Sequence, residues 1–246
     1  LLRHELRVAP EYGASFVNVH IGSHMGTGIE AGIARVAEAV QRMGLSYAVL
    51  TMVARDDLAD GGFAHVSECV RAIRERNPVT RVETLVSDAK GDAASLSLLF
   101  SARPDVFNHN IETVARLQRA VRPSAGYARS LGVLARAKDV GLVVKSGLVL
   151  GMGETSEEVD GCLADLAGIG VDIVTIGQYL RPTTHHIPVA RWIDPDEFTR
   201  WKQVGESLGI SHVESSPLTR SSYHAKQSAD ASSEAVPVVL SRVLKP

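Results

Sequence analysis

The sequence predicts an α/β fold built on a parallel sheet. Short apolar runs typical of strands alternate with apolar stripes at helical spacing along most of the chain, and the connections between them are short. Parallel strands need a crossover between them, so repeated strand–helix units favour a parallel sheet with outer helices. Right-handed crossovers repeated this often curl into a partial or full barrel. A doubly wound open sheet is the competing architecture.

The expected elements follow one another in regular order. The strands are predicted at residues 14–21, 47–53, 82–86, 106–108, 142–150 and 173–176. The run 47–53 is apolar throughout, as in strands that are buried on both faces. Helices are predicted at residues 33–43, 66–73, 96–100, 113–121, 130–140, 159–166 and 196–208. Gly44 ends the first helix, and Pro195 precedes the last one, because proline favours a first turn.

Composition narrows the class of protein. The chain has 246 residues and a formal net charge of −2, so it has no basic field for phosphates, which argues against nucleic acid as a partner. Its two cysteines, Cys69 and Cys162, cannot form a disulfide framework, which favours a reducing compartment. Both lie on apolar helical stripes and are expected in the core. Without a membrane span or signal peptide, a cytoplasmic protein of one domain is expected.

Polar residues gather where the predicted strands end. In a barrel, functional residues lie at the carboxyl ends of the strands, in the loops that lead into the helices. Residues 55–57, 108–112 and 151–154 occupy such places. Lys145 instead interrupts an apolar strand, which costs free energy unless the charge is paired. We therefore expect Lys145 to reach a carboxylate or a substrate.

Five short runs, taken in order, resemble the lipoyl synthase family over residues 35–226. They are RDDL at 55–58, PDVFNHN at 104–110, KSGL at 145–148, GQYL at 177–180 and RSSYHA at 220–225. The resemblance implies a radical S-adenosylmethionine enzyme with a partial (βα)6 TIM-like barrel of parallel strands and outer helices. It also implies two [4Fe–4S] clusters and insertion of two sulfur atoms into an octanoyl chain on a lipoyl carrier domain.

The same resemblance divides the chain into three parts. Residues 1–34 are a divergent amino-terminal segment, residues 35–226 are the barrel, and residues 227–246 are a carboxy-terminal tail. Within the tail, the composition of residues 228–233 is typical of a flexible linker. Residues 238–244 are expected either as an edge strand or as a tail without fixed structure.

One stretch resembles the motif by which this family contacts S-adenosylmethionine from its fifth strand. Its residues are Gly147, Val149, Gly151 and Glu154. Glycine has no Cβ, so such a strand can approach a ligand closely. The alternative is an ordinary strand–helix turn, with Glu154 in the first turn of the helix, where the macrodipole favours an acidic residue.

Asn108, Asn110 and Glu112 follow the fourth predicted strand and form a second candidate group. Their side chains are suited to paired hydrogen bonds with the ribose or amino acid end of S-adenosylmethionine. Asn110 and Glu112 are equally suited to cap a helix that begins near Thr113. The sequence leaves both interpretations open.

The cluster ligands are the point at which the sequence departs from the family. Ser222 matches the serine that holds the auxiliary cluster in the family, with Ser221 as the near alternative. The first strand and cluster loop are altered or shortened, because residues 22–34, where the loop is expected, contain no cysteine. Since thiolates are the usual ligands of these clusters, the sequence predicts that this chain does not hold them. The alternative function is a non-catalytic relative that binds S-adenosylmethionine or an acylated lipoyl domain.

Overall fold

The computed structural model describes residues 18–20 and 28–234 of the chain. Within them, parallel strands form one seven-stranded sheet in the order β1-β2-β3-β4-β5-β6-β7. The strands are β1 (Asn18–His20), β2 (Tyr47–Thr51), β3 (Arg81–Leu85), β4 (Val106–Asn108), β5 (Val143–Leu150), β6 (Ile173–Gln178) and β7 (His212–Ser215). β1 and β7 lie at the two edges, so the sheet is an open, partial barrel rather than a closed one.

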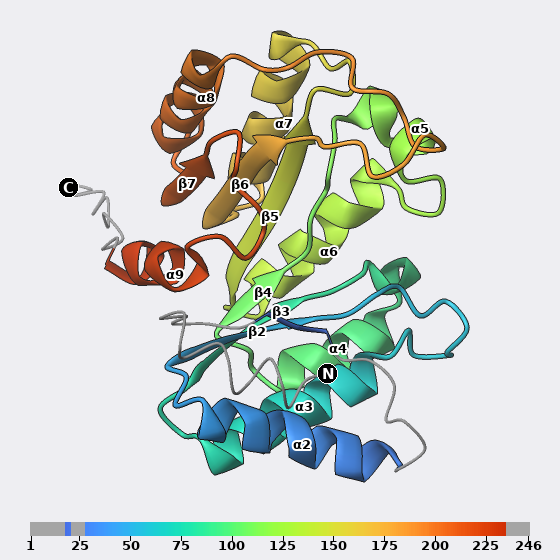
Figure 1. Cartoon of the computed structure of the whole chain (residues 1–246), viewed down its shortest axis with the longest axis vertical. Coiled ribbons are helices and arrows are strands. Elements are labelled where there is room, and N and C mark those ends of the chain that lie inside the picture. The colour runs from blue at the N-terminus through green and yellow to red at the C-terminus, as the bar shows by residue number, and fades with distance from the viewer. Residues whose placement is uncertain (1–17, 21–27, 235–246) are drawn as a thin grey trace, which may run out of the picture.

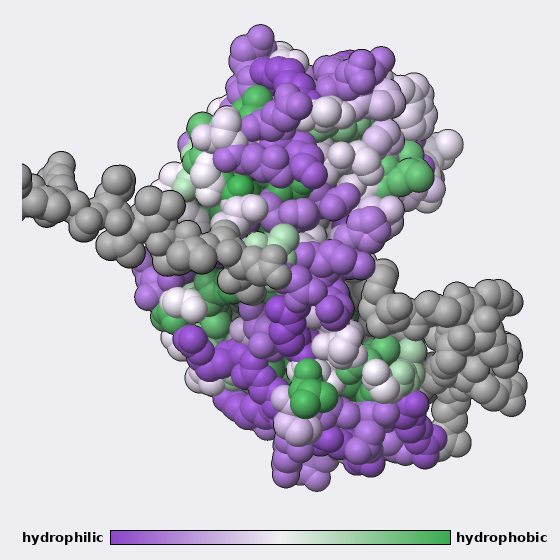
Figure 2. Space-filling view, turned by 90° about the vertical axis from the view of Figure 1, so that its left-hand side faces the viewer, coloured by the Kyte–Doolittle hydropathy of each residue, from purple (hydrophilic) through white to green (hydrophobic). Residues whose placement is uncertain are grey.

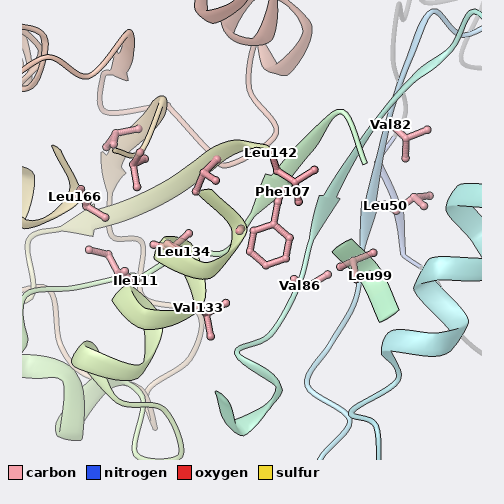
Figure 3. Packing of buried hydrophobic residues seen from close by; sticks show 14 of the residues in the cluster. Leu50, Val82, Val86, Leu99, Phe107, Ile111, Val133, Leu134, Leu142 and Leu166 are labelled. Atoms are coloured by element: carbon pink, nitrogen blue, oxygen red, sulfur yellow. The ribbon is translucent and has the colours of Figure 1, made fainter. Parts of the chain in front are cut away.

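Helices cover the outer face of this sheet (Figure 1). They are α2 (Ile29–Arg42), α3 (Phe63–Arg76), α4 (Ala93–Ser101), α5 (Gln118–Val121), α6 (Tyr127–Asp139), α7 (Ser156–Gly168) and α8 (Pro195–Ser207). The main core lies between the strands and these helices, and Figure 3 shows Phe107 of β4 packed among residues such as Leu99 and Leu134 from them. Alternate residues along each strand point to opposite faces, so the other half of each strand faces the interior of the partial barrel.

The last described helix, α9 (Ala225–Glu234), lies on the inner face of the sheet. Ala225 and Ala229 are one turn apart and pack against Tyr47, Val49 and Val106 from β2 and β4. The composition of residues 228–233 wrongly predicts a flexible linker, because these residues belong to α9. Burial of the two small alanines against strands far away in the chain makes this segment helical, and composition does not report that contact.

The other predicted strands and helices agree with the structure to within a few residues. The sequence did not predict β7, which is short and has polar residues at three of its four positions. The helix predicted at 113–121 is wrong in its first half, because residues 115–117 form a 3-10 turn that leads into α5. The strand predicted at 14–21 is present as β1, and the remainder of it lies outside the described residues, as do residues 238–244. Of the expected cluster loop, residues 22–27 also lie outside them, while residues 29–34 form the start of α2.

The surface of the described residues is largely polar. Figure 2 shows a face on which hydrophilic residues predominate and hydrophobic residues form small, separate groups. Among the helices that the structure describes, none is both long and apolar enough to cross a membrane.

Candidate functional site

The carboxyl ends of β4 and β5 are joined by an unusual backbone connection. After β4 ends, the chain turns back onto β5, where the Glu112 amide donates to the carbonyl of Gly147 at 2.9 Å. The Val149 amide in turn donates to the carbonyl of Glu112 at 2.9 Å. Glu112 has a φ of 66°, a left-handed conformation that costs free energy in a residue with a side chain. The strained turn therefore fixes Glu112 beside the second half of β5.

Gly147 provides the space in which Asn110 lies. A Cβ at Gly147 would be 2.7 Å from Oδ1 of Asn110 and 2.7 Å from Oγ1 of Thr175. The Asn110 amide also donates to Oγ of Ser221 at 2.5 Å, which connects β4 to the segment after β7. We call Asn110, Glu112 and Gly147 the cradle. The structure therefore brings together three of the predicted site residues that come from separate parts of the chain.

Two acceptor atoms in this region lack partners. Oδ1 of Asn110 and Oδ1 of Asn108 are buried and have no hydrogen-bond partner among the described residues. An unsatisfied buried acceptor is costly in an ordinary core, so its occurrence calls for an explanation. Burial raises the pKa of Glu112, while Asn110 and the Arg122 guanidinium oppose that rise. Unpaired acceptors beside a strained turn are a pattern typical of a ligand site.

The structure also decides against the capping interpretation of Asn110 and Glu112. The 3-10 turn Ala115–Leu117 is preceded by Val114, and no side chain caps it. Neither Asn110 nor Glu112 therefore has the role of a helix cap. The alternative prediction was wrong because the chain after β4 first pairs with β5 and becomes helical only several residues later.

Four buried side chains next to the cradle are joined by polar contacts, and we call them the buried polar network: Glu83, Lys145, Tyr47 and Asn108. Its centre is the carboxylate of Glu83 on β3, which forms an ion pair with Nζ of Lys145 at 3.0 Å. The hydroxyl of Tyr47 donates to Oε2 of Glu83 at 2.8 Å, and the amide of Asn108 donates to Oε1 at 2.7 Å. The prediction that Lys145 reaches a carboxylate is confirmed, and both charged side chains have no exposed surface.

Gly151 and Glu154 form a closed loop after β5. The Glu154 carboxylate accepts hydrogen bonds from the backbone amides of Gly151 and Met152. Gly151 has a φ of 109°, and a Cβ there would lie 2.3 Å from Nε2 of Gln178 and 2.6 Å from the carbonyl of Arg191. In this structure the space beside Gly151 is thus filled by the protein itself. Glu154 also precedes the capping residue of α7, so it is not in the first turn of that helix.

Ser222 is half-buried and lies in the segment between β7 and α9. Its neighbour Ser221 is the one that contacts the cradle, through Asn110. Among the side chains that the structure describes, those of residues 28–232, no three of His, Cys, Asp or Glu lie close enough to hold a metal ion. Cys69 and Cys162 are buried, and burial raises the pKa of each thiol to about 12. The expectation that both cysteines are core residues is confirmed.

Comparison with known proteins identifies the family. Residues 27–166 match the model of the Radical SAM superfamily. The chain is 54% identical to a lipoyl synthase of Rubrobacter xylanophilus over 80% of its length, and 53% identical to one of Chlorobaculum tepidum over 78%. The chain belongs to the lipoyl synthase family. It spans 62% of the Rubrobacter protein and 67% of the Chlorobaculum protein.

Two solved structures show the same fold at low identity. The hydrogenase maturase HydG superposes with a TM-score of 0.58 at 14% identity, over 85% of this chain and 53% of that one. Methylornithine synthase (PylB) superposes with a TM-score of 0.52 at 17% identity, over 73% of this chain and 58% of that one. These likenesses confirm the predicted parallel, barrel-like α/β fold.

The family implies two kinds of cofactor, [4Fe–4S] clusters and S-adenosylmethionine, and the described residues do not suit them equally. A [4Fe–4S] cluster does not fit, because the thiols of Cys69 and Cys162 are buried in separate helices and are held protonated. S-adenosylmethionine fits better, because its donor groups suit the buried acceptors of Asn108 and Asn110, which have no partner among the described residues. Sequence reasoning missed Glu83, because its strand also contains Arg81 and Thr84, so a single charge does not stand out there as Lys145 does in β5.

Proposed function

We propose that this chain provides the part of a lipoyl synthase that binds S-adenosylmethionine, at the carboxyl ends of β4 and β5. The family's reaction inserts two sulfur atoms into a protein-bound octanoyl-lysine, so an octanoylated lipoyl carrier domain is the proposed partner. The observation that carries the proposal is the pair of buried, unpartnered acceptors on Asn108 and Asn110 beside Gly147. S-adenosylmethionine carries the ammonium, hydroxyl and amine donors that such acceptors bind.

The roles of the chain's own residues follow from their positions. Asn110 and Glu112 would hold polar groups of the ligand, and Gly147 would give the Asn110 side chain the room that it needs beside β5. Val149 would support Glu112 through its backbone hydrogen bond. Gly151 and Glu154 would shape the loop that borders the site, because their polar groups are already used within it. When its clusters are bound, a family member gains reductive cleavage of S-adenosylmethionine and a source of sulfur.

We propose further that this polypeptide does not assemble those clusters itself. The supporting observation is the absence of accessible thiolates: both cysteines lie in the core. Ser222 would therefore have no cysteines in this chain with which to share an auxiliary cluster. The function of the chain alone would then be binding, which is the non-catalytic alternative.

Calorimetry with S-adenosylmethionine tests the binding function. We expect the wild-type chain to release or take up heat on titration, and Asn110→Ala to bind about tenfold more weakly, as expected for loss of one buried hydrogen bond. The matched control is Asn77→Ala. Asn77 is also a buried asparagine, but it lies after α3, where its amide donates to the carbonyl of Ala37 at 3.0 Å. No heat with the wild-type chain would refute the proposal.

Reconstitution with iron and sulfide tests the proposal that this chain does not assemble the clusters itself. After anaerobic incubation with iron and sulfide, we expect no charge-transfer absorbance at about 400 nm, where thiolate-ligated clusters absorb. A brown protein with stoichiometric iron would show that this chain does hold a cluster. The control is a cluster-binding protein treated in the same way.

A further inference from the structure

The buried polar network places three donors from three different strands around one carboxylate. Tyr47 on β2, Asn108 on β4 and Lys145 on β5 all donate to Glu83 on β3. Glu83 and Lys145 have no exposed surface, so water does not compete for these contacts. Burial and the neighbouring Glu83 raise the pKa of Tyr47, which keeps the phenol protonated and able to donate. The carboxylate is therefore held in one orientation from three sides.

Stability alone does not account for this arrangement. Removing two charges from water costs several kcal/mol per ion, and replacing a buried ion pair with apolar residues is often neutral or stabilising. The surrounding inner face is apolar at Val49 and Val106, which pack on α9. Apolar side chains at all four positions of the network would leave no donor unpaired and would therefore suit the same interior. The network calls for a role other than holding the fold together.

The network determines which way the Asn108 amide points. Nδ2 of Asn108 donates to Glu83 at 2.7 Å, so Oδ1 is turned away from the carboxylate. A flipped amide would place Oδ1 against the negative charge, which the ion pair with Lys145 keeps in place. Oδ1 is thus held as a buried acceptor that has no partner among the described residues.

The network and the cradle face the same interior. Lys145 is two residues before Gly147 on β5, and side chains two residues apart along a strand lie on the same face. Asn108 pairs with Lys145 in the sheet register and is two residues before Asn110. Asn108 therefore lies beside Lys145, one step below the cradle on the same face of the sheet.

From this arrangement we infer that Glu83 and Lys145 are positioning residues for ligand binding. The pair fixes Asn108 so that Oδ1 accepts a hydrogen bond from an N–H or O–H group of S-adenosylmethionine bound in the cradle. This inference rests on the proposed function of the same site. Glu83 and Lys145 touch no ligand themselves and act through Asn108.

Calorimetric titrations of a set of variants with S-adenosylmethionine test the inference. The double variant Glu83→Gln, Lys145→Met keeps the shapes of both side chains and removes both charges, so the Asn108 amide is free to flip. We expect it to bind about tenfold more weakly than wild type, the effect of one misdirected buried hydrogen bond. Asn108→Leu should show a similar loss. The triple variant should bind no more weakly than Asn108→Leu, because the pair acts only through that residue.

The control uses an ion pair elsewhere in the fold, between α6 and the residue that precedes β6. Lys138 and Asp172 form an ion pair at 2.5 Å near the amino ends of β5 and β6, far along the strands from the cradle. The variant Lys138→Met, Asp172→Asn removes the same two charges there and should leave the affinity unchanged. Thermal unfolding of each variant shows whether it is folded during the titration.

The outcomes separate the two proposals. If the wild-type chain binds and the Glu83, Lys145 variant binds equally well, the inference is overturned while the proposed function stands. The inference would also be overturned if the triple variant (Glu83→Gln, Lys145→Met, Asn108→Leu) lost the affinity of the double variant and of Asn108→Leu added together. Such a result would show that Glu83 and Lys145 affect binding by a route other than Asn108. If the wild-type chain does not bind, the proposed function itself fails. Should the double variant unfold, Glu83→Gln alone is expected to weaken binding about threefold, and unchanged affinity in it would refute the positioning role.

Discussion

His109 predicts a loss of stability in mild acid. Its ring lies in the core, with Nδ1 at 2.9 Å from the carbonyl of Val86 and Nε2 at 2.9 Å from Oγ of Ser130. A carbonyl only accepts, so Nδ1 carries the proton and Nε2 accepts from the Ser130 hydroxyl. Burial lowers the pKa of His109 to about 4. In the unfolded chain the pKa of a histidine is about 6.5.

The sign and size of the effect follow from these two values. Below about pH 6.5 the unfolded chain binds a proton that the folded chain refuses, so stability decreases as the pH falls and the loss levels off below the folded pKa of about 4. Between about pH 7.5 and about pH 5, this single group is expected to remove about 2 kcal/mol from the free energy of unfolding.

The measurement compares the wild-type chain with His109→Asn. Asparagine keeps a donor for the Val86 carbonyl but does not titrate. Urea unfolding followed by circular dichroism at the two pH values gives the free energies, and other titrating groups cancel in the difference between the two proteins. We expect the wild-type chain to lose about 2 kcal/mol more than the variant. Equal losses in both proteins would refute the assignment of a neutral, buried imidazole.

Two further predictions concern the loop after β5 and the cysteines. Gly151→Ala should lower the free energy of unfolding by about 2–4 kcal/mol, because its Cβ would meet Nε2 of Gln178 and the backbone must keep a φ of 109°. Gly161 lies in α7, and no atom lies near the position of its Cβ, so Gly161→Ala should instead raise the free energy of unfolding by about 0.5–1 kcal/mol. Thermal unfolding of the two variants checks this difference, and equal effects of Gly151→Ala and Gly161→Ala would contradict the clash at Gly151. Cys69 and Cys162 should react with a thiol reagent at neutral pH only after unfolding, since burial raises both pKa values to about 12; rapid labelling of the native chain would contradict their burial.

The order of strands and helices could be predicted from the sequence because each element carries its own pattern. Strands such as β2 are mainly apolar and buried throughout, and helices such as α3 have an apolar stripe with the helical period. β7 carries a weaker signal, since three of its four residues are only half-buried. α9 carries none, because its helical state depends on contacts with Tyr47 and Val49.

The site was predictable in part for the same reason. A lysine in an apolar strand indicates a buried charge with a partner, and the structure provides one. The identity of that partner, Glu83, depends on which strands are neighbours, which a local pattern does not contain. Likewise Gly147 and Gly151 look alike in the motif, yet one makes room for Asn110 and the other for Gln178.

Helix α9 has a consequence for how this protein is made. The inner surface of β2 and β4 is covered by residues from the far end of the described chain (Figure 1). During synthesis on the ribosome, Tyr47 and Val49 therefore stay uncovered until Ala225 and Ala229 have emerged. Contacts between distant parts of a chain form slowly, and uncovered apolar strands in such nascent chains are what chaperones bind. The described contacts over Glu83 are thus completed only after α9 has been made.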